Sequence, residues 1–146
     1  GGTDANPIAD TSHHTFEIVN AGHRNNPNVW LGYYSSLGYA IGYHYFIDKT
    51  GKTTQGRGDL EKGAHTKGYN DNSIGICLAG NFDRPLASAN SKPTKEQIDS
   101  LRVLLTRLVA KYQIPIKSIL PHREFAKYKT CFGTNLPDTF GQDILT

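Results

Sequence analysis

The most regular alternation of apolar and polar positions lies late in the chain, between Thr94 and Pro115. Apolar residues recur there at spacings of three and four, the period of one face of an α-helix. They are Ile98, Leu101, Leu105, Leu108 and Tyr112. Thr94 can cap the first turn, and Gln97 stands three residues later, as in a capping box. We predict an amphipathic helix of about 18 residues that ends before Pro115.

The middle of the chain has the composition of β-strands. Residues 41–47 are rich in aromatic side chains and strand formers. Residues 48–51 supply a turn before a second short strand at 52–55, so we expect a hairpin. Residues 74–80 form a continuous small and apolar run, which is typical of a strand buried on both faces. A further short strand is predicted at 118–120, before His122.

The remaining segments show no clear period. Residues 82–93 are polar and rich in Pro, Ser and Asn, which predicts a surface loop. A helix is hard to recognise in residues 15–26. Strands followed by one long helix predict an α/β fold with a central mixed β-sheet flanked by helices. No repeat or linker divides the chain, so we expect one domain over residues 1–146.

Composition narrows the class of protein further. The chain has 146 residues, 37% of them hydrophobic, which suits one modest core. Its net charge of +3 is too small to indicate a nucleic-acid partner. No apolar run approaches the roughly 18 residues of a membrane span, and no signal peptide is visible. We therefore expect a monomer without nucleic-acid or membrane partners.

Histidine and cysteine provide the candidate chemistry. One member of the pair His13 and His14, together with His122 and Cys131, would supply two imidazoles and one thiolate. That donor set suits zinc, and three protein ligands leave the fourth position for water, as in catalytic zinc sites. By spacing alone the same residues fit a cysteine nucleophile with a histidine base, or simple burial.

Several ordered motifs carry a resemblance to a known family. They are His13-His14-Thr15, Gly42-Tyr43-His44-Tyr45-Phe46-Ile47, Gly63-Ala64-His65-Thr66-Lys67-Gly68-Tyr69-Asn70, Asn72 to Gly80, and His122 to Cys131. In this order the chain resembles the zinc-dependent N-acetylmuramoyl-L-alanine amidases of type 2, a superfamily that includes the peptidoglycan recognition proteins. The likeness is greatest to small single-domain phage endolysins and spans about residues 13–133. Compared with that family pattern, residues 33–40 look like an insertion.

The resemblance implies a role for six residues. One zinc ion would be held by His13, His122 and Cys131. Tyr43 and Lys129 would be catalytic, Lys129 as a fixed charge near the oxyanion and Tyr43 as a proton carrier, with Glu124 as a competitor for that role. His65 would line the substrate groove.

The implied function is hydrolysis of the amide between N-acetylmuramic acid and L-alanine in bacterial peptidoglycan. A phage enzyme without a signal peptide would accumulate in the host cytoplasm before its release to the wall. No separate wall-binding domain is recognisable. The alternatives are a non-catalytic peptidoglycan-binding module of the same fold and a thiol peptidase built on Cys131 and His122.

Three further His and Cys residues are expected to have structural roles rather than chemical ones. His14 is expected beside the metal ligands rather than among them, although the polar segment 10–12 leaves the choice between His13 and His14 open. We expect His44 to be a packed structural residue and Cys77 to be a small core side chain rather than a disulfide partner of Cys131.

Overall fold

A three-stranded mixed sheet forms the centre of the fold, with strand order β2-β1-β3. β1 (Tyr45–Ile47) pairs antiparallel with β2 (Thr53–Gln55) and parallel with β3 (Ile76–Leu78). The structure is a computed structural model that describes residues 9–25, 34–125 and 129–146. The mixed central sheet and the hairpin are as the sequence predicts.

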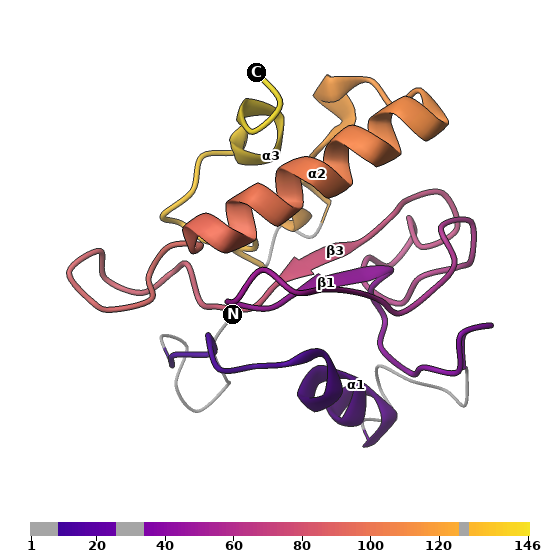
Figure 1. Cartoon of the computed structure of the whole chain (residues 1–146), viewed down its shortest axis with the longest axis horizontal. Coiled ribbons are helices and arrows are strands. Elements are labelled where there is room, and N and C mark those ends of the chain that lie inside the picture. Colours follow the sequence, from indigo (N-terminus) through magenta and orange to yellow (C-terminus); the bar gives the residue numbers. More distant parts are fainter. Residues whose placement is uncertain (1–8, 26–33, 126–128) are drawn as a thin grey trace.

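Helices cover both faces of this sheet, as Figure 1 shows. α2 (Lys95–Tyr112) crosses one face and α1 (Phe16–Asn25) lies on the other. The short α3 (Phe140–Asp143) lies on the same side of the sheet as α2. Two 3-10 helices, η1 (Ile116–Ser118) and η2 (His122–Glu124), connect α2 to the C-terminal segment. None of the helices described is long and apolar enough to cross a membrane.

α2 has the boundaries that its pattern predicts. The Thr94 side chain accepts from Gln97 N, and the Gln97 side chain accepts from Thr94 N, so the capping box is complete. The helix ends at Gln113, whose backbone is left-handed. The Gln97 amide also donates to the carbonyls of Ile47 and Ala79, which ties the start of α2 to the ends of β1 and β3.

Alternation along β1 divides the apolar core into two clusters. Tyr45 and Ile47 point to one face of the sheet and pack with the leucines of α2. Phe46, between them, points to the opposite face and packs with Phe16 at the start of α1. The two clusters are the reason that helices are needed on both faces of so small a sheet.

The turn between β1 and β2 uses the predicted residues. The Asp48 carboxylate accepts from the backbone N–H groups of Thr50 and Lys52. Gly51 has φ +88°, and a Cβ there would lie 2.8 Å from the Glu96 carbonyl oxygen of α2. The tight turn therefore places α2 directly over the hairpin.

Three sequence predictions differ from the structure. Residues 118–120 are not a strand, because Ser118 and Ile119 donate locally to the carbonyls of Pro115 and Ile116 and form η1. His122 accordingly starts η2 rather than following a strand. Residues 41–44 and 74–75 stay outside the strands, and β3 is only partly buried.

The N-terminal helix was hard to recognise in the sequence but is present as α1. Thr15 Oγ1 accepts from Ile18 N at its start, and Phe16 and Val19, three residues apart, pack on the core. Its other positions are mostly polar, which conceals the helical period. Of the expected insertion at 33–40, residues 34–40 are described and are irregular.

Candidate active site

The candidate site gathers at the beginning of β1 and β3, around the rings of Tyr43 and His65. These two rings are stacked, with centroids 6.3 Å apart and an interplanar angle of 14°. The His44 ring meets the His65 ring edge-on at 5.5 Å, and the His23 ring from α1 lies 5.6 Å from Tyr43. Because Tyr43 also packs with the α1 cluster, the site belongs to the α1 side of the sheet.

Glycines and a closed loop fix the position of His65. A Cβ at either Gly63 or Gly75 would lie 2.5 Å from Cδ2 of the His65 ring, so only glycine fits on both sides of it. Asn70 Oδ1 accepts from the backbone N–H groups of His65 and Thr66, at 2.9 and 2.8 Å. Ring Nδ1 of His65 hydrogen bonds the Thr66 hydroxyl at 2.8 Å.

The other ring nitrogen of His65, Nε2, differs from Nδ1 in its surroundings. Nε2 is buried and has no hydrogen-bond partner among the described residues. Burial, with smaller contributions from His44, His122 and Arg57, lowers the pKa of His65 to about 4. At neutral pH the ring is therefore uncharged, and Nε2 is a buried nitrogen without a hydrogen bond to the part of the chain that the structure describes.

Tyr43 is a protonated hydrogen-bond donor in this environment. The neighbouring Cys77 sulfur, burial and Cys131 together hold the pKa of Tyr43 well above its usual value. Tyr43 also hydrogen bonds the Cys77 thiol. Burial raises the pKa of Cys77 to about 11, so that side chain remains a thiol. Both cysteines are free, which agrees with the expected absence of a disulfide between them.

Buried polar side chains, which we call the polar frame, bond the backbone segments next to Tyr43 and His65. His44 is fully buried; its Nε2–H donates to Glu61 O at 2.7 Å, and its Nδ1 accepts from Gly75 N at 3.0 Å. Arg57, 1% exposed, donates to the carbonyls of Ile41 and Lys62, each at 2.8 Å. His44 is thus a packed structural residue, as expected.

Sequence reasoning missed two members of this frame. Arg57 bonds both segments that carry the site, yet a single Arg in a Gly-rich turn gives no signal for burial. His23, to which no role was assigned, accepts from Gly42 N through Nδ1 at 2.8 Å. The missed α1 helix hid that contact, because the helix brings His23 toward Tyr43.

His122, Lys129 and Cys131 approach the same cluster from the C-terminal segment. Arg123 N donates to Cys131 O at 2.8 Å, so the Cys131 backbone lies beside η2. Burial and the Lys129 charge lower the pKa of His122, while a hydrogen bond with the His65 backbone opposes that shift. Cys131 also contributes to the raised pKa of Tyr43.

His13 stands apart from this group. Its side chain is exposed, and its ring lies 4.7 Å from that of His14 in an edge-on arrangement. Within residues 9–25, 34–125 and 129–146, no three His, Cys, Asp or Glu side chains are grouped closely enough to hold a metal ion. The donor types of His122 and Cys131 nevertheless suit zinc.

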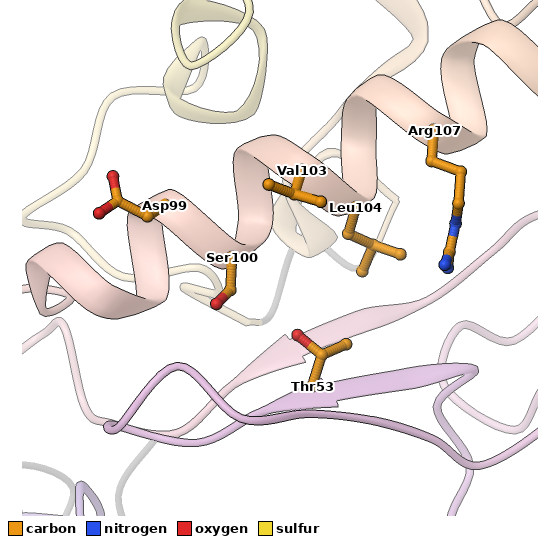
Figure 2. Close-up of a pocket in the computed structure, with 6 residues that line it drawn as sticks. All are labelled: Thr53, Asp99, Ser100, Val103, Leu104 and Arg107. Atoms are coloured by element: carbon orange, nitrogen blue, oxygen red, sulfur yellow. The ribbon is translucent and has the colours of Figure 1, made fainter.

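A separate pocket lies on the opposite side of the sheet, between β2 and α2 (Figure 2). Its lining residues are Thr53, Asp99, Ser100, Val103, Leu104 and Arg107. Asp99 is already paired with Lys95 and Arg102. The pocket contains none of the predicted site residues, so it is distinct from the Tyr43–His65 site.

The fold and the site define the class. A mixed sheet between α1 and α2, with Tyr43 and His65 at one end, is the type 2 amidase and peptidoglycan recognition protein fold. The chain belongs to the N-acetylmuramoyl-L-alanine amidase family, whose sequence profile matches residues 5–134.

Phage endolysins and a clostridial amidase are among the proteins similar to this chain. The endolysin of Enterobacteria phage T3 is 47% identical over 74 residues, covering 50% of this chain and 48% of its own. That of Escherichia phage T7 is 42% identical over 92 residues, covering 62% and 58%. The endolysin LysCS of Clostridium intestinale has a TM-score of 0.67 at 26% identity, covering 91% and 75%. The aligned part of this chain thus spans about half the length of those two phage relatives.

Proposed function

We propose that this chain is a zinc-dependent N-acetylmuramoyl-L-alanine amidase of the phage endolysin type. Its substrate would be bacterial peptidoglycan, cut at the amide between N-acetylmuramic acid and L-alanine. The observation that carries this proposal is the protonated Tyr43 stacked on His65, with His122 and Cys131 beside them, in a chain of the amidase family. We also propose that it acts as one catalytic domain and as a monomer, made in the host cytoplasm and released to the wall.

The residues of the site have separate tasks in this proposal. Tyr43 stays protonated at neutral pH, so it can donate a hydrogen bond to the scissile carbonyl oxygen and relay a proton from the attacking water to the leaving amine, regaining its own proton in the same step. Lys129 supplies positive charge where negative charge develops. His65 lines the substrate groove in this proposal, and its ring, stacked on Tyr43, holds the Tyr43 ring in position for the substrate.

Zinc is the cofactor of this proposal, since the amidase family generally depends on it. His122, Cys131 and His13 would hold the ion, which supplies a polarised water and a Lewis acid when bound. Of the three, His13 has an exposed side chain, and its ring contacts that of His14. Elemental analysis of the His13→Ala and His14→Ala variants tests this assignment: zinc should be lost from the first and kept by the second.

A second candidate function is binding of peptidoglycan without hydrolysis. The observation in its favour is that no three donors are grouped for a metal among the described residues. Against it stands Cys131, a thiolate donor that a binding module does not need. The two functions differ in whether new chain ends form.

Digestion of purified peptidoglycan separates them. New alanine amino termini without new reducing sugar ends, abolished by a zinc chelator and restored by added zinc, are expected of the amidase. Binding to peptidoglycan without any new termini would establish the binding module. Cleavage that persists in the chelator would contradict the metal and indicate that Cys131 is a nucleophile.

A further inference from the structure

Arg123 is placed to organise the segment that contains Lys129 and Cys131. The residue lies in η2, directly after His122. Its Nε donates to Asp138 Oδ1 at 2.7 Å, and its Nη2 donates to Leu136 O at 2.8 Å. Nη1 donates to the carbonyls of Gly133 and Thr130, at 2.8 and 3.2 Å. One guanidinium therefore reaches four points of a segment that has no regular secondary structure of its own.

Two more contacts link Arg123 to the neighbourhood of the Cys131 thiol. The backbone N–H of Arg123 donates to Cys131 O at 2.8 Å. The guanidinium carbon also lies 5.5 Å from the centre of the Phe132 ring, in cation–π contact. Each residue from Thr130 to Gly133 thus contacts Arg123.

Other anchors of this segment bind the loop after β3 rather than η2: the Asn135 amide donates to the carbonyls of Arg84 and Ser91, and Asn135 N donates to Phe82 O. The Asp83 carboxylate accepts from the Thr130 hydroxyl and from Thr134 N, at 2.5 and 2.7 Å. Asp83 lies in the loop after β3, so it ties the segment to the sheet. Arg123, in contrast, ties the segment to the helical turn that contains His122.

We propose that Arg123 is a positioning residue that holds Cys131 and Lys129 at the correct place relative to His122. The proposal rests on the function proposed above. Arg suits this task because its planar group has five N–H donors in fixed directions, whereas a Lys ammonium is a point charge. Residues that orient metal ligands in this way typically change metal affinity about 10- to 100-fold when they are replaced.

Zinc affinity of four variants tests the proposal. We expect Arg123→Ala to weaken zinc binding about 10- to 100-fold, and Arg123→Lys to do so nearly as much. Asp138→Asn removes only the exposed ion pair and leaves the bonds to the carbonyls, so its zinc affinity should stay near wild type. Arg102→Lys is the matched control, because Arg102 also bonds a carbonyl and a carboxylate, but on α2.

The measurement is competition with a chromophoric chelator, alongside the unfolding midpoint of each metal-free variant. A purely structural role would lower the midpoint while folded Arg123→Lys keeps wild-type zinc affinity, and that result would overturn the proposal. If Arg123→Ala does not fold, Arg123→Lys decides the question.

A second readout keeps the inference separate from the proposed function. If wild-type protein binds no zinc, the metal proposal fails, and alkylation of Cys131 in a Cys77→Ala background replaces the affinity measurement. A positioning role predicts faster alkylation of Cys131 in Arg123→Lys than in Asp138→Asn, because the guanidinium bonds to the carbonyls of the segment are lost and only the backbone bond from residue 123 to Cys131 O remains. Equal rates would contradict it.

Discussion

The two faces of the sheet are held by different proportions of apolar and polar contact. On the α2 face, Tyr45 and Ile47 pack with Leu101, Leu104, Leu105 and Leu108, all buried, and the buried Gln97 bonds the backbone at Ile47 and Ala79. On the α1 face, apolar packing is joined by buried polar side chains that bond the backbone: Asn20 to residues 40 and 41, His44 to residues 61 and 75, and Arg57 to residues 41 and 62.

The two kinds of contact suit different tasks: one stabilises the fold, and the other positions the residues of the site. Apolar packing is nondirectional and tolerates small shifts, so it suits a scaffold. Hydrogen bonds to particular carbonyls fix irregular segments to within a few tenths of an ångström, which a catalytic arrangement needs. We therefore expect substitutions on the α2 face to change stability and substitutions on the α1 face to change activity.

The largest expected effect is on activity, from Tyr43→Phe. Loss of the hydroxyl should lower the rate of peptidoglycan cleavage about 100- to 10,000-fold, because the donor to the carbonyl oxygen is removed. The free energy of unfolding should change by less than about 1 kcal/mol. Tyr45→Phe is the matched control on the α2 face, where the hydroxyl bonds Asp59; its cleavage rate should stay normal. Equal cleavage rates in the two variants would contradict the expected difference between the two faces.

The largest expected effect on stability comes from Leu108→Ala. Leu108 is 2% exposed in the α2 cluster, so the cavity should lower the free energy of unfolding by about 2–5 kcal/mol. Urea unfolding measures this loss, and the cleavage rate per folded molecule should be unchanged. Val103→Ala serves as control, because Val103 is 71% exposed on the same helix and should shift stability by at most about 0.5 kcal/mol.

A smaller effect is expected at the start of α2. Thr94→Ala removes the side-chain cap and the hydroxyl bond to Lys49 O, so unfolding should become easier by about 1 kcal/mol. Thr94→Ser keeps the hydroxyl and should retain most of that stability. Thermal unfolding of the pair measures the difference; equal melting of the Ala and Ser variants would show that the cap contributes nothing.

The smallest effect appears only in acid. Burial alone would raise the pKa of Asp59, but hydrogen bonds from Tyr112 and Tyr45 and the Lys111 charge outweigh it and lower that pKa below the usual value. A carboxylate with a lowered pKa stabilises the fold above its unfolded pKa of about 4, and the contribution disappears as the pH falls through the folded value. Asp59→Asn should therefore lose less stability than wild type between about pH 5 and pH 2, measured by urea midpoints. Parallel acid curves would contradict this.

The same comparison explains how much the sequence could predict. The α2 helix and the β1–β2 hairpin follow from local patterns: leucines at helical spacing, the Thr94–Gln97 box, and Asp48 with Gly51 at the turn. The prediction of a strand at 118–120 was wrong. The segment between Pro115 and Pro121 is short, and its backbone makes local hydrogen bonds that form η1.

The site was only partly predictable for a physical reason. Motifs indicate Tyr43 and His65, which the structure stacks together. Arg57, His23 and Arg123 escaped notice because their partners are backbone carbonyls and N–H groups, which every residue carries and no side-chain pattern reveals. The roles of His13, His122, Cys131 and Lys129 stay predictions.

Hydrolysis of a defined N-acetylmuramoyl-L-alanyl peptide in water enriched in heavy oxygen tests the central claim most directly. Amidase action breaks the carbon–nitrogen bond, leaves one water oxygen in the lactyl carboxylate of the muramic acid, and gives its hydrogen to the alanine amine. We predict that mass spectrometry finds the heavy oxygen in that carboxylate and none in the released peptide. Heavy oxygen in the product of cleavage at another bond would contradict the account, as would a substrate that remains intact with the zinc-loaded protein.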